Sequence, residues 1–138
     1  MKYWINTVSR DHVVLGVAGG FTQANHGKDS MLKKLRAGDW IVFYSPKTAY
    51  ENGEPLQAFT AIGQVQDDDM YQVEMAPGFI PWRRNIRFYD CTEIPIKPFI
   101  SELSFITDPT HWGYRFRFGM FEIPEPDFVL LRDALMRL

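Results

Sequence analysis

Cysteine is nearly absent from this chain. Cys91 is the only one among 138 residues, so the sequence contains neither a disulfide framework nor a cysteine-based zinc site. Histidine is also scarce, because only His12, His26 and His111 are present and none of them has the spacing of a helical metal pair. We therefore expect no metal site and no cofactor.

Long apolar runs are missing as well. No segment approaches the roughly 20 apolar residues that a membrane-spanning helix needs. The first residues, Met1-Lys2-Tyr3-Trp4-Ile5-Asn6, contain no apolar stretch of signal-peptide length. The expectation is a cytoplasmic protein without a membrane partner.

An excess of positive charge is the third absence. The formal net charge is −2, which excludes a surface that is basic all over and holds nucleic acid by releasing counterions everywhere. Any binding to phosphates must therefore use a local group of cations.

Aromatic side chains are what the sequence has in plenty. They make up 15% of the residues, with four Trp, six Tyr and eleven Phe, which makes an aromatic-lined pocket more plausible than in an average chain. Hydrophobic residues at 46% and charged residues at 23% are typical of a folded domain. A chain of 138 residues has the length of one domain with a real core, so we expect a single domain over 1–138.

The segment 37–47 predicts a central strand. Gly38 and Asp39 indicate a turn, strand-forming residues follow, and Pro46 is expected to end the strand because it has no N–H for a sheet ladder. Tyr44, Ser45 and Lys47 stand at the strand end, where functional sites are often built. An ordinary core strand with a polar exit is the competing interpretation.

The segment 20–28 is dense in side-chain donors and acceptors. Gln23, Asn25, His26 and Lys28 lie close together beside Phe21. Such a loop can offer hydrogen bonds and a stacking surface to a planar ligand. A solvated loop between two helices is the alternative.

The remaining pattern predicts an α+β fold. Strands are expected over 2–8, 58–65, 71–75, 85–91 and 114–123, with a negatively charged turn at the three aspartates 67–69. Short helices are expected after Ser9, with Val13, Val14 and Val17 facing the core, after Asp29 or Ser30, and over 99–105. A last helix is expected after Pro124, and the residues that face the core from it are Phe128, Leu131, Leu135 and Leu138. Short helices between the first two strands favour a curled mixed sheet or open barrel that ends in a helix.

Five segments together resemble the EVE-domain proteins of the UPF0310 type. They are 2–5, 19–23, 38–47, 55–63 and 112–119, in that order along the chain. The resemblance implies a PUA-like fold, related to the YTH and ASCH domains, and a pocket that reads a modified base in DNA or RNA.

We therefore predict a nucleic-acid-binding module, not an enzyme. The ligand-binding candidates are Ser9, Phe21, Gln23, Asn25, His26, Tyr44, Ser45 and Trp82, and the phosphate-binding candidates are Lys28, Lys47, Arg83, Arg84 and Arg117. Phe21, Tyr44 and Trp82 are expected to provide stacking surfaces, and Gln23, Asn25 and Ser45 to read polar edges. Two alternatives stay open. One is a small-molecule protein or enzyme acting on a nucleobase-like ligand, with His26 and Ser45 as base and nucleophile, and the other is a protein-interaction module.

Overall fold

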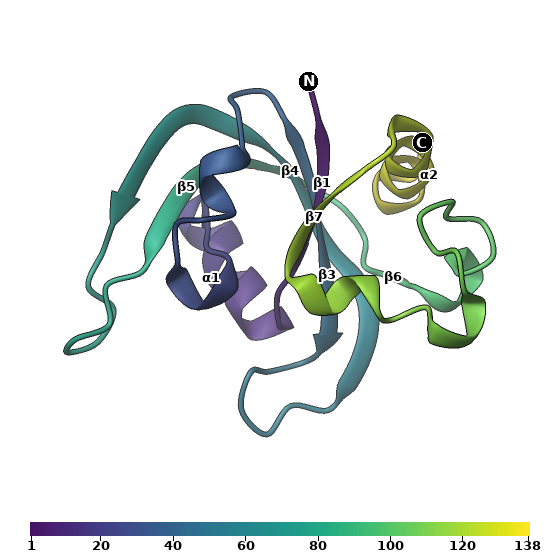
Figure 1. Ribbon diagram of the computed structural model, residues 1–138, viewed down its shortest axis with the longest axis horizontal. Helices are drawn as coiled ribbons and strands as arrows, with labels where there is room; N and C mark the ends of the chain where they lie inside the picture. Colours follow the sequence, from purple (N-terminus) through teal and green to yellow (C-terminus); the bar gives the residue numbers. More distant parts are fainter.

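The protein folds around one curled, mixed sheet (Figure 1). The computed structural model describes the backbone of residues 1–138 and every side chain except that of Asn25. Within these residues the strands are β1 (Tyr3–Thr7), β2 (Phe21–Thr22), β3 (Trp40–Lys47), β4 (Pro55–Gln72), β5 (Trp82–Tyr89), β6 (Ile94–Pro95) and β7 (Met120–Ile123), and the helices are α1 (Arg10–Gly19) and α2 (Glu125–Met136).

The sheet runs in the order β2-β5-β4-β3-β1-β7, and β6 pairs with β4. The two neighbours β1 and β3 are parallel, and every other pairing is antiparallel. The connection between these parallel strands carries α1, β2 and two 3₁₀ turns over Asn25–Gly27 and Leu32–Lys34. The short elements expected between the first two strands are therefore present, although the second is only a 3₁₀ turn.

Strand β3 is buried on both faces. Val42 and Tyr44 pack into a core shared with α2 and the segment before β7, whereas Ile41 and Phe43 pack into a second core with Val13 of α1. Because successive side chains of a strand point to opposite faces, one strand serves both cores. In Figure 1, α1 lies on the side of the sheet enclosed by β4 and β5, and α2 lies on the opposite side.

Strand β4 is longer than the sequence predicted. It continues through Asp67, Asp68 and Asp69, where the pairing with β5 shifts register between Val65 and Met70. The aspartates occupy this bulge and not a turn, and the expected separate strand at 71–75 begins as the end of β4. Strand β3 likewise passes through Pro46, which sits in a register irregularity that requires no N–H from it.

Three other expectations were wrong. Residues Arg115–Phe118 form a 3₁₀ turn, so strand β7 begins only at Met120. The segment expected as a helix over 99–105 contains only the end of a 3₁₀ turn over Lys97–Phe99. In α1, Val13 is buried, whereas Val14 and Val17 are exposed, and Leu138 lies beyond α2.

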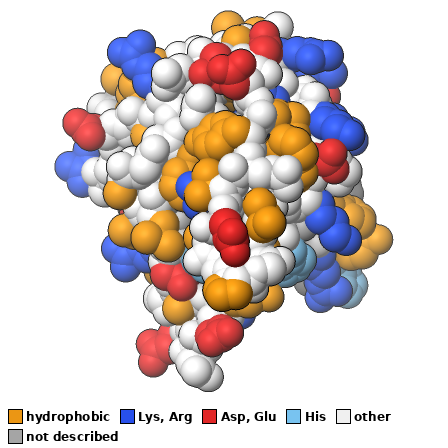
Figure 2. Space-filling view, turned by 90° about the vertical axis from the view of Figure 1, so that its left-hand side faces the viewer, with side chains coloured by type: hydrophobic (Ala, Val, Ile, Leu, Met, Phe, Trp, Pro, Cys, Tyr) orange, Lys and Arg blue, Asp and Glu red, His pale blue; other side chains and the backbone are white. Residues whose placement is uncertain are grey.

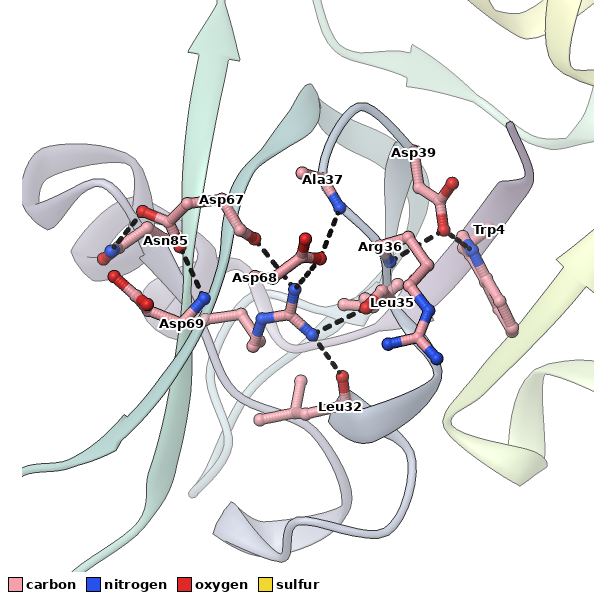
Figure 3. A network of polar contacts seen from close by, with 11 residues as sticks. Trp4, Leu32, Leu35, Arg36, Ala37, Asp39, Asp67, Asp68, Asp69 and Asn85 are labelled. Atoms are coloured by element: carbon pink, nitrogen blue, oxygen red, sulfur yellow. Dashed lines mark hydrogen bonds and ion pairs between the residues drawn. The ribbon is translucent and has the colours of Figure 1, made fainter.

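A buried arginine fastens the chain before β3 to the sheet (Figure 3). The Arg84 side chain is 2% exposed, and its Nη1 donates to the carbonyl oxygens of Leu32 and Leu35 at 2.7 and 2.8 Å. Its Nη2 donates to the Asp67 carbonyl oxygen at 2.9 Å and lies 3.7 Å from the Asp68 carboxylate. Arg84 therefore holds the fold and is not available as the phosphate contact that the sequence suggested.

Candidate functional site

A groove of about 1050 Å³ lies at the carboxyl ends of the parallel strands β1 and β3. Thr7, Val8 and Ser9 from β1 and its exit, with Tyr44 and Pro46 from β3, form its centre. One wall comes from α1, β2 and the turn at 26–28, and the other from residues 112–119. Parallel strands bring their carboxyl ends to one edge of the sheet, which explains why both exits meet here. The volume is large enough for a ligand of nucleoside size.

Asp11 connects the start of α1 to the β3–β4 loop. Its carboxylate accepts hydrogen bonds from the Ser9 hydroxyl at 2.6 Å, from the backbone N–H of His12 at 2.9 Å and from that of Tyr50 at 3.2 Å. Burial alone would raise the pKa of the Asp11 carboxyl, but these hydrogen bonds outweigh it and lower that pKa. The Ser9 proton is thus committed to a carboxylate, which leaves the Ser9 oxygen as an acceptor toward the groove.

Tyr50 stands at the groove mouth beside two histidines. Its ring stacks with His12 at 5.6 Å between centroids and meets His26 edge-on at 6.0 Å. The Lys47 ammonium donates to the Tyr50 carbonyl oxygen at 2.7 Å and lies 5.5 Å from the Tyr50 ring. Lys47 therefore supports this loop, and it is not among the residues that line the groove.

Gln23 is held from two sides. The Arg83 guanidinium lies over the Phe21 ring, and its Nε donates to Gln23 Oε1 at 2.9 Å. The buried Asn6 amide nitrogen donates to the Gln23 carbonyl oxygen at 2.9 Å. Since a guanidinium only donates, the Gln23 oxygen must face Arg83, and its amide N–H groups remain for a ligand. One face of the Phe21 ring is covered by Arg83, so only the other face can be open for stacking.

The turn at Gly27 brings the groove wall against the hairpin between β4 and β5. A Cβ atom on Gly27 would lie 2.5 Å from Pro81 Cβ, and the residue has a φ of +83°, so only glycine fits both the contact and the backbone. Phe79 and Met75 of the hairpin, 42% and 46% exposed, line the groove beside this turn.

Tyr44 lines the groove, but its ring belongs to the core. The side chain is 2% exposed and packs against Phe116 at 4.2 Å and Phe59 at 5.4 Å between ring centroids. A ring enclosed in this way cannot stack on a base, which corrects the role expected for Tyr44. Only its hydroxyl remains for contact with a ligand.

The structure brings together seven of the candidate residues from the sequence around one groove: Ser9, Phe21, Gln23, His26, Lys28, Tyr44 and Arg117. Five others, Ser45, Lys47, Trp82, Arg83 and Arg84, are not among the residues that line it. Ser45 is fully buried, with its hydroxyl bonded to the Val8 carbonyl oxygen and Thr60, and Trp82 packs against the second core. Ser45 cannot read a base edge and Trp82 cannot stack in the groove. The side chain of Asn25 lies outside the described residues.

Several groove residues were missed by sequence reasoning. Besides Phe79 and Met75 these are Thr7, His12, Tyr50 and Trp112. Tyr50 and Phe79 sit in turn-rich segments where nothing local indicates a site, because the fold alone brings these segments to the mouth. Trp112 lies in the segment 112–119, one of the five that resemble the EVE-domain family, and this resemblance was the one sequence signal that could have marked it as a site residue.

Cations are sparse around the groove. Lys28 and Arg117 line it, both exposed, and neither takes part in an ion pair within the described residues. Figure 2 faces the side that carries β5 and shows apolar side chains interspersed with both signs of charge. A second hollow of about 920 Å³ lies beside Lys34, Arg36 and the buried Asp39.

Across the described residues, no three His, Cys, Asp or Glu side chains are grouped so that they could hold a metal ion. Neither described helix has both the length and the apolar character needed to cross a membrane. The expected cytoplasmic location stays a prediction.

The chain is similar to several curated proteins over nearly its whole length. It is 65% identical over 136 residues to a UPF0310 protein of Mycolicibacterium vanbaalenii, covering 99% of this chain and 94% of that one. It is 45% identical over 134 residues to the UPF0310 protein YdcG of Bacillus subtilis, covering 97% and 92%.

Solved structures confirm the fold class. Protein Atu2648 from Agrobacterium tumefaciens matches with a TM-score of 0.59 at 13% identity, covering 95% of this chain and 90% of that one. Rpa0253 from Rhodopseudomonas palustris matches with a TM-score of 0.57 at 16% identity, covering 97% and 92%. The expected α+β fold, a curled mixed sheet that ends in a helix, is therefore correct. The family model named EVE domain matches residues 2–134, and the chain belongs to the EVE-domain family.

Proposed function

We propose that this protein binds nucleic acid and holds one modified base in the groove at the ends of β1 and β3. The observation that carries the proposal is the groove itself, which combines aromatic walls, an oriented amide at Gln23 and two cations at its rim. Membership of the EVE-domain family supports the same function.

The energetics suit a base taken out of its stack. Extrusion costs a few kcal/mol, and stacking on an aromatic face returns about 1–3 kcal/mol per base. The exposed rings that line the groove are Tyr50 and Phe79, each with almost half of its surface free. They replace Tyr44 and Trp82 as our candidates for stacking, and Phe21 keeps only the face that Arg83 leaves open.

The polar groups divide into base and phosphate contacts. Gln23 offers amide donors, and Ser9 offers an acceptor, to the edge of a planar ring. Lys28 and Arg117 are placed for the phosphates on either side of the base. Because only two lysine or arginine side chains line the groove within the described residues, we expect moderate affinity that depends on the base as well as on salt.

A fluorescence titration that uses the tryptophans tests this proposal. The probes are short single- and double-stranded DNA and RNA oligonucleotides that differ at one position, which carries an unmodified base, a modified base or no base. Binding should be tightest for one modified base and weaken at high salt. Equal affinity for the modified base and for the abasic site would contradict base recognition, and no binding at low salt would remove nucleic acid as the ligand.

We propose a binding module in preference to an enzyme. The enzyme alternative needs Ser45 as nucleophile and His26 as base. The Ser45 hydroxyl, however, is hydrogen-bonded to the Val8 carbonyl oxygen and to Thr60, and Ser45 does not line the groove. A hydroxyl held in this way has no access to a substrate. Turnover of a nucleoside by purified protein, lost in His26→Ala, would reverse this assignment.

A further inference from the structure

Two hydroxyl groups at the groove have no hydrogen-bond partner among the described residues. Thr7 lines the groove, and its Oγ1 is buried without a partner. Tyr44 also lines the groove, and burial alone, with no hydrogen bond or charge contributing, raises the pKa of its hydroxyl. Buried polar groups nearly always have partners, so the enclosed Thr7 hydroxyl without one is unusual and points to something that binds there, and the Tyr44 hydroxyl at the same groove is not fully enclosed and can share that partner.

The two residues are direct neighbours across the parallel strands. Thr7 of β1 is in register with Tyr44 of β3, and the Val8 N–H donates to the Tyr44 carbonyl oxygen at 2.9 Å. Ile5, two residues before Thr7, shares a core with Tyr44, so both side chains lie on the same face of the sheet. The face is the one covered by Trp112 and Phe116, which also line the groove.

The surroundings decide which partner fits. The Tyr44 ring is enclosed by Phe59 and Phe116, and protein atoms near the Thr7 hydroxyl make no hydrogen bond with it. A partner must therefore come from the groove. Tyr44 stays protonated and neutral, and the two lysine or arginine side chains that line the groove within the described residues, Lys28 and Arg117, are both exposed. An uncharged oxygen can satisfy the hydroxyls, whereas a charged group would lose its water in this site.

We propose that Thr7 and Tyr44 receive an uncharged oxygen-bearing substituent of the bound base, such as a hydroxymethyl or carbonyl group, and discriminate against a methyl group. The proposal rests on the proposed function. A methyl group seated here leaves both hydroxyls unpaired, whereas a hydroxyl group donates to one and accepts from the other. The site is thus a specificity determinant for the kind of modification.

Ser45 provides a matched control in the same strand. It follows Tyr44 directly and points to the opposite face, where its hydroxyl is bonded to the Val8 carbonyl oxygen at 2.7 Å and to Thr60 at 2.8 Å. Thr7→Val and Tyr44→Phe remove hydroxyls that have no protein partner and keep the side-chain shape. Ser45→Ala removes a hydroxyl that has two.

The experiment combines binding and stability. Wild type and the three variants are titrated with oligonucleotides that carry cytosine or uracil with hydrogen, methyl or hydroxymethyl at C5, and with the corresponding free nucleosides. We expect wild type to prefer hydroxymethyl over methyl by about tenfold or more, which corresponds to about 1.4 kcal/mol. This preference should vanish in Thr7→Val and Tyr44→Phe and persist in Ser45→Ala.

The melting temperatures without ligand are an independent readout. Thr7→Val should melt at or above the wild-type temperature because it removes a buried polar group that has no partner, Tyr44→Phe should melt at the wild-type temperature because its hydroxyl has no protein partner to lose, and Ser45→Ala should melt lower. Hydroxymethyl selectivity for nucleosides without oligonucleotide binding would support the inference and reject the nucleic acid. The inference would be overturned by a preference for methyl, by an unchanged preference in both variants, or by no binding of any probe. Destabilisation of both variants would also overturn it, because that result is expected if the hydroxyls hold only an ordered water.

Discussion

The guanidinium group of Arg83 stacks on the ring of Phe21, with its central carbon 3.7 Å from the ring centroid. In this position its Nε–H also fixes the Gln23 side chain. Arg83 was expected to contact phosphate, but its geometry is that of a residue that orients another. A lysine at this position would keep the charge and lose both the stacking and the directed hydrogen bond.

Arg83→Lys should therefore reduce base preference more than salt dependence. We expect the preference for the favoured modified base to fall about tenfold, the equivalent of about 1.4 kcal/mol. The slope of log K against log salt should stay as in wild type, because no phosphate contact is lost. A variant that keeps its base preference while its salt slope falls would make Arg83 a phosphate contact after all. The measurement is the same oligonucleotide titration at several salt concentrations.

Arg84→Met should destabilise the protein. It removes the donors for the carbonyl oxygens of Leu32, Leu35 and Asp67, and each buried acceptor left unpaired costs about 1–3 kcal/mol. We expect a loss of at least about 2 kcal/mol in the free energy of unfolding, measured by urea denaturation. Wild-type stability combined with weaker binding would show that Arg84 serves the ligand and not the fold.

Lys28 and Arg117 should account for the salt dependence. Lys28→Gln and Arg117→Gln should each lower the salt slope by about 0.9, the value for one phosphate contact on duplex DNA. Lys47→Gln is the matched control, since the Lys47 ammonium is bonded to the Tyr50 carbonyl oxygen. If the salt slope changed only in Lys47→Gln, the phosphates would be bound at the β3–β4 loop and not by Lys28 and Arg117.

The stability that Asp11 contributes through its hydrogen bonds at the groove mouth should depend on pH. The pKa of Asp11 is lowered in the folded state, so its contribution to stability is fully present above the unfolded value of about 3.9 and is lost as the pH falls through the lowered folded value. The side chain is 43% exposed, which limits that contribution to less than about 1 kcal/mol.

Asp11→Asn tests this pH dependence. Its difference in unfolding free energy from wild type should be present at pH 7, begin to shrink as the pH falls below about 4, and disappear only below the lowered pKa of the folded state, where the wild-type carboxyl is itself protonated. Amide exchange at Tyr50, whose N–H is bonded to Asp11, should be faster in the variant at pH 7. Equal exchange in both proteins would show that other contacts hold the loop.

Much of the fold could be predicted, because its strongest signals are local. Strand β3 was expected from its run of strand-forming residues, and it is buried on both faces. The segment 114–118 misled because an alternating sequence was taken as a strand, whereas Gly119, at a φ of +81°, ends a 3₁₀ turn before β7. The aspartates at 67–69 misled for a similar reason, since a bulge inside a long strand carries the same polar residues as a turn.

The candidate site was predicted in part for a physical reason. Polar residues at strand ends, such as Gln23 and Ser9, were found because their position in the chain suggests exposure. Tyr44, Ser45 and Arg84 are the same kinds of residue, but their neighbours come from distant segments and bury them. Sequence alone could not separate a hydroxyl that is bonded, as in Ser45, from one that is not, as in Tyr44.

The most direct test of the account is a map of backbone amide chemical shifts as the full chain is titrated with an oligonucleotide that carries the favoured base. We predict that the perturbed amides gather at residues 7–9, 23–28 and 112–119, three segments that line the groove. Perturbations centred on Lys34, Arg36 and Gly38, which line the second hollow, would contradict the account and place the ligand on another part of the protein.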